Sequence, residues 1–215
     1  VLAVFVDDLP TLLEHALSSL ARVTVGIGCS FVVAVPLGLL IGRYEILDML
    51  TDWSIQIFRS VPPISLIPLA ILLLGIGDKP AISLIFLSGL WPLLINTIFG
   101  VRGIERTLIK VARAARAGEF LVMKDIVLPA ALPAIFTGLR LAVGAGWLTV
   151  VTAEMLAVKS GLGYMILNGQ LTFRSDLIIA GIIVIGGIGL LADQLVRLVR
   201  ARVCRWQEGL TASPI

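Results

Sequence analysis

The chain has 215 residues, of which 58% are hydrophobic and only 14% charged, and its formal net charge is +3. A soluble domain has about 25% charged residues, so this composition excludes an ordinary soluble globular fold. Apolar stretches close to the ~20 residues that cross a hydrocarbon core recur along the whole sequence. They are continuous and rich in Gly and Leu, which is typical of packed membrane helices. We therefore predict an all-α, polytopic transmembrane helical bundle.

Five membrane spans are expected in chain order. The first covers about 20–42 and follows an amphipathic approach segment. The second, 63–77, is short and interrupted by Pro62, Pro63 and Pro68, so it is either re-entrant or extended by residues 53–58. The last three cover about 81–100, 135–157 and 177–196. We treat 1–215 as one transmembrane domain.

The distribution of Lys and Arg predicts the orientation. Most basic residues flank or occupy 43–61, 101–130 and the C-terminal tail, which places these segments in the cytosol and the first residues outside. The 101–130 loop stays on the basic side even if 63–77 is re-entrant. Because topology accounts for the basic residues, the positive charge does not indicate nucleic-acid binding.

The 101–130 loop is predicted to form one helix, or two short ones, outside the bilayer. Its residues alone fit a basic helix that rests on anionic lipid headgroups. However, KVARAARAGEFLVMKDIVLPAALP, at 110–133, resembles the EAA loop of ABC importer permeases. The pattern of that family is Glu-Ala-Ala, three residues, Gly, nine residues, Ile, one residue, Leu-Pro. Aligned on Leu128 and Pro129, the family Glu is replaced by Lys110 and the family Gly by Arg116.

Six further segments support this resemblance: RSVPP at 59–63, IPLAILLLGIG at 67–77, WPLLINT at 91–97, IFTGLR at 135–140, AEM at 153–155 and SGLGYMI at 160–166. Together they are similar to the nitrate, bicarbonate, taurine and sulfonate branch, over about residues 10–206. The resemblance implies a type I importer (MetI-like) permease fold in a bacterial-type inner membrane, with a cytoplasmic C-terminus. Members of the family usually have one more span at the N-terminus, which is not visible here.

In such a permease the loop is a coupling helix that sits in a groove of a separate ATPase. The resemblance assigns this role to Lys110, Val111, Ala112, Arg113, Ala114, Ala115, Arg116, Ala117 and Gly118, with a helix break at Leu128 and Pro129. The two replaced residues leave two alternatives. Either the ATPase groove is more acidic than usual, or the contact is mainly apolar, through residues 111, 112, 114 and 115.

The resemblance also implies the partners. They are a second copy of the chain, two ATPase subunits that use ATP and Mg, and an extracytoplasmic binding protein that delivers a small anion, nitrate or bicarbonate rather than taurine or sulfonate. The chain has no G-x-x-x-x-G-K-[ST], so it is not expected to be an enzyme or to hold a cofactor. The glycines at 161 and 163 indicate a turn. No metal site is expected, because His15 is the only histidine.

Several polar side chains lie within the spans. Arg22 and Glu154 fall in the outer half, and Arg140 and Asp193 in the inner half, so each pair can form an ion pair, although Asp193 can also pair with Arg197. These charges either fix helix packing or line the anion path. The uncharged candidates for the path are Asn96, Thr97, Thr149 and Thr152, whose alternative is to bond to neighbouring backbone. Glycines 144, 146, 186, 187 and 189 are expected at close helix contacts.

Two other function classes remain open. An ion-gradient-driven secondary transporter would show inverted repeats and paired interrupted helices, and we find no such symmetry. A membrane anchor without transport would not need the RSVPP and WPLLINT segments.

Overall fold

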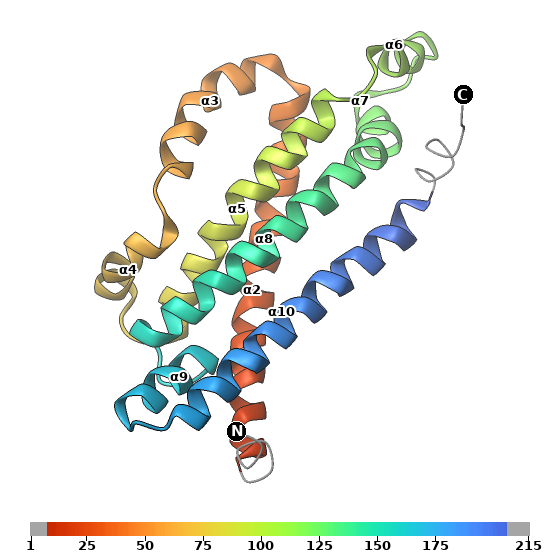
Figure 1. Cartoon of the computed structure of the whole chain (residues 1–215). Helices are drawn as coiled ribbons and strands as arrows, with labels where there is room; N and C mark the ends of the chain where they lie inside the picture. The colour runs from red at the N-terminus through yellow and green to blue at the C-terminus, as the bar shows by residue number, and fades with distance from the viewer. Residues whose placement is uncertain (1–7, 206–215) are drawn as a thin grey trace.

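The computed structural model describes residues 8–205, apart from the side chains of Arg106 and Arg113. All regular structure in these residues is helical (Figure 1). The elements are α2 (Leu9–Arg43), α3 (Glu45–Arg59), the 3-10 helix η1 (Pro63–Leu66), α4 (Ile67–Leu74), α5 (Asp78–Arg102), α6 (Arg106–Ala114), α7 (Glu119–Val122), the π-helical turn η2 (Met123–Val127), α8 (Leu128–Ala157), α9 (Leu162–Leu171) and α10 (Ser175–Val203).

Helices α2, α5 and α8 form the packed centre of the bundle. Small residues bring their backbones together, as expected for helices that associate in lipid. A Cβ on Gly26 would lie 2.6 Å from Ile85, and one on Gly38 would lie 2.6 Å from Thr97, so α2 and α5 touch along their length. Gly138 has the same function on α8, where a Cβ would lie 3.0 Å from the Pro92 carbonyl.

Within residues 8–205, four helices are long and apolar enough to cross a membrane: α2, the continuous helix Glu119–Ala157, α5 and α10. A fifth crossing is obtained if α3 and the segment Pro63–Leu74, which meet at a bend of 74°, count as one broken span. The sequence analysis left two alternatives for residues 63–77, a re-entrant segment or a span extended by residues 53–58. The expectation of a loop at 43–61 is wrong, because 45–59 is a helix that runs back alongside α5 (Figure 1). The bend falls where Pro62 and Pro63 stop α3.

The bundle has two distinct ends. At the α6 end lie α6, α7, the end of α2 and the end of α10 (Figure 1). At the α9 end lie α9, the start of α2 and the start of α5 (Figure 1). Helix α10 runs along the outside and is the least buried of the candidate spans, with 11% of its most apolar window buried.

The expectation for the five glycines is only partly right. A Cβ on Gly146 would lie 2.8 Å from Ile27, and one on Gly189 would lie 3.2 Å from Trp147, so both are at close contacts. Nothing in residues 8–205 lies within 4 Å of a Cβ built on Gly144, Gly186 or Gly187. The prediction is wrong for these three within one chain, because they point away from the packed helices.

Candidate coupling and transport sites

The segment 106–127 lies at the α6 end and is helical, as the sequence predicted, but only α6 is a separate short helix, because 119–127 continues into α8. On α6, Leu108 and Val111 are 50% and 63% exposed, and Phe120 on α7 is 82% exposed. Ala112 faces the opposite way and is only 9% exposed, packed in a cluster with Val122 and other apolar residues. One face of α6 therefore packs on the bundle, and its outer face exposes apolar side chains. Of the four apolar residues expected to contact an ATPase, Ala112 is not accessible.

The remaining residues of the predicted coupling helix divide between α6 and the turn that follows it. Lys110, Ala114, Ala115, Arg116 and Gly118 are exposed, and Ala117 is half-buried. Arg113 belongs to α6, but its side chain lies outside the described residues.

The turn after α6 has a specific cap. The Ala117 N–H donates to the Ala112 carbonyl at 3.0 Å, and Arg116 has a φ of 57°. This is a Schellman motif, in which the residue in the left-handed conformation is usually Gly, because a side chain there is strained. Arg116 is the position on which the family Gly falls, so the structure gives a physical reason for the family preference. In this chain the same turn forms with Arg116 in the strained left-handed conformation.

The helix break expected at Leu128 and Pro129 is wrong. The backbone is helical from Glu119 to Ala157, and the π-helical turn η2 leads directly into α8. Pro129 is tolerated because it stands at the start of α8, where the wider π turn has already changed the hydrogen-bond pattern. The interruption lies instead at 115–118, between α6 and α7. Consequently α7 is a direct extension of α8, and α6 is joined to it by a non-helical turn.

A buried polar cluster lies at the α9 end. Glu154 of α8 is fully buried, and its carboxylate accepts hydrogen bonds from Arg22 Nη1 at 2.7 Å, Ser19 Oγ at 2.9 Å and the Gly163 N–H at 3.0 Å. Arg22 of α2 is 6% exposed, and its Nε also donates to Asp78 at 2.8 Å. The predicted Arg22–Glu154 ion pair is therefore present in the structure.

Four of the five N–H donors of Arg22 are directed at protein acceptors. Besides the two carboxylates, Nη1 donates to the Ser160 carbonyl at 2.9 Å and Nη2 to the Ser160 hydroxyl. A single guanidinium thus joins α2, α5, α8 and the 158–161 turn. Because four of its five N–H donors are already used by the protein, Arg22, like Glu154, fits the structural alternative better than the transport path.

The glycines of the SGLG segment are explained by this cluster. Gly161 has a φ of 104°, and a Cβ on it would lie 2.2 Å from the Glu154 carboxyl carbon. A Cβ on Gly163 would lie 2.2 Å from the Val151 carbonyl oxygen. Both glycines let the chain close over the carboxylate of Glu154, which agrees with the turn that the sequence indicated.

The uncharged pathway candidates bond to their own helices. Asn96 Nδ2 donates to the Pro92 carbonyl at 2.8 Å, Thr149 Oγ1 to that of Ala145 at 2.9 Å and Thr152 Oγ1 to that of Leu148 at 3.2 Å. Thr97 makes the same kind of bond, to Leu93. None of these four lines the cavities described below. Their backbone bonds fit the structural alternative that the sequence analysis left open.

At mid-bundle toward the α6 end, Asp193 of α10 pairs with two arginines. It accepts from Arg140 of α8 and from Arg197 Nη2 at 3.0 Å, one turn along its own helix. The two alternatives expected from the sequence thus occur together. These groups are partly exposed, unlike the cluster at the α9 end.

A polar face on α3 was not anticipated from the sequence. Asp48, Asp52, Gln56 and Arg59 follow one another at helical spacing and line a cavity of about 230 Å³ between α3 and α5. The spacing of 4, 4 and 3 residues was visible in the sequence and would have placed these groups on one face of a helix. It was missed because the segment was taken for a loop.

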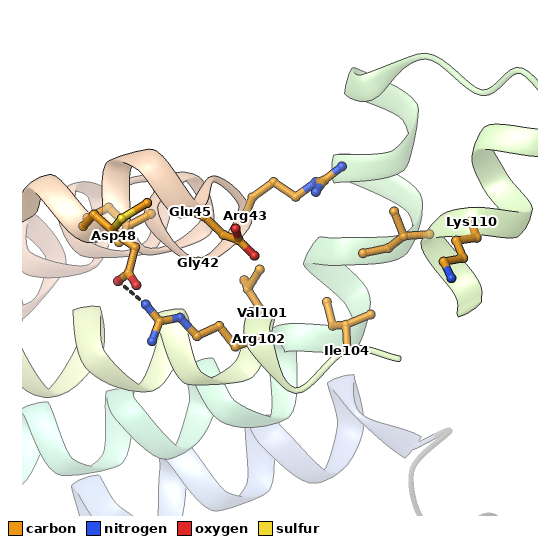
Figure 2. A pocket seen from close by; sticks show the side chains of 11 residues that line it. Gly42, Arg43, Glu45, Asp48, Val101, Arg102, Ile104 and Lys110 are labelled. Atoms are coloured by element: carbon orange, nitrogen blue, oxygen red, sulfur yellow. Dashed lines mark ion pairs between the residues drawn. The ribbon is translucent and has the colours of Figure 1, made fainter. Parts of the chain in front are cut away.

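A larger cavity of about 670 Å³ lies at the α6 end, between the end of α2, the start of α3, the end of α5 and α6. Figure 2 shows Asp48 facing Arg102, with which it forms an ion pair, and Lys110 on the far side of the cavity. Arg43 turns toward α7, where it pairs with Glu119 at 3.1 Å. Its Nε atom is buried and has no hydrogen-bond partner in the described part of the chain.

Comparison with known proteins connects these features to a family. Residues 34–205 match the family described as binding-protein-dependent transport system inner membrane component. A putative ABC transporter permease of Methanocaldococcus jannaschii is 37% identical, covering 92% of this chain and 74% of that protein. The taurine transport system permease TauC of Escherichia coli is 33% identical (91% and 71% covered), and the bicarbonate transport system permease CmpB of Synechococcus elongatus is 36% identical (89% and 69%).

Among solved structures, the chain is similar to one of inward-facing MetNI, a methionine ABC transporter. The TM-score is 0.72 at 21% identity, over 89% of this chain and 97% of that one. At this identity the likeness shows the fold alone, and it confirms the type I permease fold implied by the EAA-like loop. The chain therefore belongs to the binding-protein-dependent inner membrane components, the permease subunits of ABC importers, which are not enzymes themselves and rely on a separate ATPase subunit.

Proposed function

We propose that this protein, as a pair of identical copies, imports a small anion that an extracytoplasmic binding protein delivers, and that α6 transmits the motion of two ATPase subunits. The observation that carries the proposal is the construction of α6. One face is packed on the bundle through Ala112, the other exposes Leu108 and Val111, and a turn at 115–118 separates the helix from α7. We infer that α6 moves as a unit about this turn.

The α6 end is the cytoplasmic end in this proposal. The basic residues of α6 and of the last turn of α10 lie there, as the positive-inside rule requires. An ATPase in the cytosol then meets α6 directly, and ATP and Mg bind only to that partner. The α9 end faces the binding protein.

The nature of the cargo is supported by the relatives named above, whose substrates are taurine and bicarbonate. Both are small molecules with an anionic group. We favour bicarbonate or nitrate over taurine and sulfonates because of the WPLLINT and IFTGLR segments. No comparison supports the ion-gradient-driven alternative.

Co-purification from native membranes tests the assembly. The tagged chain should recover an ATPase and a second, differently tagged copy. Val111→Asp and Lys110→Glu should each reduce ATPase recovery severalfold. Arg202→Glu is the matched control, because it makes the same charge change at the same end but on α10, and it should leave recovery unchanged. Recovery of the wild-type chain as a monomer without an ATPase would contradict the proposal.

Transport is tested in proteoliposomes that hold the purified complex, with the binding protein outside. ATP trapped inside should drive uptake of at least one of nitrate, [14C]bicarbonate and [35S]taurine. Uptake that follows an imposed ion gradient and ignores ATP would favour the secondary transporter instead.

A further inference from the structure

The start of α9 is capped by side chains of two other helices. The first N–H groups of a helix have no partner within that helix. At α9 three of them are accepted in turn by a side chain: Gly161 donates to His15 Nδ1 at 3.0 Å, Leu162 to Ser19 Oγ at 2.9 Å and Gly163 to the Glu154 carboxylate at 3.0 Å. These bonds tie α9 and the 158–161 turn to α2 and α8.

His15 differs from the other two acceptors in its response to protons. A hydroxyl oxygen accepts at any pH, and a carboxyl group keeps an accepting oxygen in both of its forms. An imidazole nitrogen accepts only while it carries no hydrogen, so His15 is neutral in this bond. Histidine takes up a proton at about pH 6.5, and its Nδ1–H would then face the Gly161 N–H, one donor against another. Of the three caps, the one from His15 is therefore the cap that acid removes.

The charges around His15 do not compensate for this loss. The charged or titratable groups that surround it are Glu14 and Arg22 on its own helix, Tyr164 on α9, Lys159 on the turn, and Asp8 and Arg174 across a cavity of about 190 Å³. The carboxylates of α5 and α8 in this region, Asp78 and Glu154, both bind Arg22. Asp8 pairs with Arg174 at 3.2 Å, and Glu14 is exposed to water, which screens its charge. A proton on His15 would place a cation near Arg22 and at the positive end of the α9 dipole.

His15 lies where protons from solution can reach it. Helix α2 has 35 residues, which at 1.5 Å per residue is about 50 Å, whereas a hydrocarbon core is about 30 Å thick. The first turns of α2 therefore extend beyond the core at the α9 end. His15 is half-buried there and lines the cavity beside Arg174.

We propose that His15 is a pH-sensitive latch: when the solution at the α9 end becomes acid, protonation of Nδ1 releases the Gly161 N–H, loosens the 158–161 turn from α2 and lowers transport. The latch follows from contacts within one chain, but its extracytoplasmic location and its effect on transport rest on the proposed function. Because only the neutral ring makes the bond, the folded chain takes up this proton less readily than the unfolded chain. The stabilisation is fully present above about pH 6.5 and decreases as the pH falls below that value.

Thermal unfolding in detergent at about pH 7.5 and about pH 5.5, on either side of the histidine range, tests the latch. His15 is the only histidine in the chain, so no second imidazole contributes. The unfolding temperature of the wild type should fall on acidification by about 3 °C, the effect of losing one hydrogen bond in a chain of this size. His15→Asn keeps an accepting atom near the Nδ1 position and does not titrate, so this fall should disappear.

Two further variants complete the unfolding test. His15→Ala lacks the acceptor at any pH and should resemble the acidified wild type in both solutions. Glu14→Gln is the matched control, because it removes a neighbouring titratable group on the same helix, and it should keep the fall. A fall in His15→Asn as large as that of the wild type would overturn the latch, because another group would then be the sensor.

The effect on transport is tested in proteoliposomes that are buffered at about pH 7.5 inside, while the outer solution is brought to about pH 5.5, below the histidine range. ATP-driven uptake by the wild type should decrease severalfold relative to uptake by His15→Asn in the same solution. Effects of acid on the probe and on the binding protein are common to both chains and cancel in this ratio. An unchanged ratio would overturn the role of the latch in transport.

The two proposals fail in different ways. If the wild-type complex shows no ATP-driven uptake at either pH, the proposed function fails, and the unfolding measurements still decide the latch. If the wild type transports and His15→Asn loses uptake and stability on acidification to the same extent, only the latch is wrong.

Discussion

The two ends of the bundle are built in opposite ways. At the α9 end, Glu154 and Arg22 are buried, and each makes several hydrogen bonds to surrounding groups. At the α6 end the ion pairs of Arg102 and Arg140 are partly exposed, two cavities lie between helices, and a non-helical turn separates α6 from α7. No residue of α3 is buried, although it lies beside α5.

This difference indicates where motion is possible. Buried, fully satisfied polar networks fix one arrangement, because any displacement leaves charged groups unpaired in a medium of low dielectric. Exposed ion pairs and loosely packed helices can exchange partners at little cost. We expect the helices to pivot about the α9 end while the α6 end opens and closes.

The largest expected effect is the loss of the Glu154 carboxylate. Glu154→Ala leaves Arg22, Ser19 and the Gly163 N–H without their acceptor, and should destabilise the protein by about 3–5 kcal/mol. Asp193→Ala, at the partly exposed pair, should cost about 1 kcal/mol or less. Thermal unfolding of the purified proteins in detergent measures both. Similar decreases in unfolding temperature for the two variants would contradict the proposed difference in rigidity between the two ends of the bundle.

A double variant checks that the effect arises from pairing. Removing Arg22 together with Glu154 should be milder than removing Glu154 alone, because no unpaired charge is left buried. Additive losses in the same unfolding assay would show that the two residues act independently.

A smaller effect is expected from the glycine that covers Glu154. Gly161 has a φ of 104°, and Gly161→Ala places a Cβ 2.2 Å from the Glu154 carboxyl carbon. This substitution should lower the free energy of unfolding by about 3 kcal/mol. Gly118→Ala, in the turn before α7, meets nothing within 4 Å and has a φ of −65°. It should be close to neutral, which makes it the matched control for the same substitution at the α6 end. Equal melting temperatures would contradict the packing described for Gly161.

The smallest expected effects are two increases in stability. Arg116 and Phe173 both occupy the left-handed position of a helix C-cap, with φ of 57° and 56°, and Phe173 is 93% exposed. Arg116→Gly and Phe173→Gly should each stabilise by about 1 kcal/mol, since neither exposed side chain loses much packing. Both should raise the unfolding temperature. A loss of ATPase recovery in Arg116→Gly alone would show that the Arg side chain also contacts the partner.

Long apolar runs were enough to predict most of the fold. The cores of α2, α5, α8 and α10 are apolar over a full membrane thickness, so hydropathy locates them without tertiary information. Helix α3 was missed because Asp48, Asp52 and Arg59 lower its hydropathy to that of a loop. Its helical nature is seen only in the spacing of those same residues.

The sites were predictable in part. The Arg22–Glu154 pair followed from the cost of single charges in a span. The helix break at 115–118 could not be predicted, because Pro129 is a stronger sequence signal for a break than an Arg in the left-handed conformation. The π-helical turn that accommodates Pro129 has no recognisable sequence pattern. Likewise the Asp48–Arg102 ion pair joins two helices whose relative position only the packing determines.

The buried cluster at the α9 end also bears on how the protein is made. Arg22 precedes Glu154 by 132 residues, so the chain emerging from a ribosome presents the arginine long before its principal acceptor. Asp78 arrives earlier and can hold the guanidinium near the water interface in the meantime. The helix that carries Glu154 and the turn with Ser160 and Gly163 come later still, so the cluster can close only after these segments have been made.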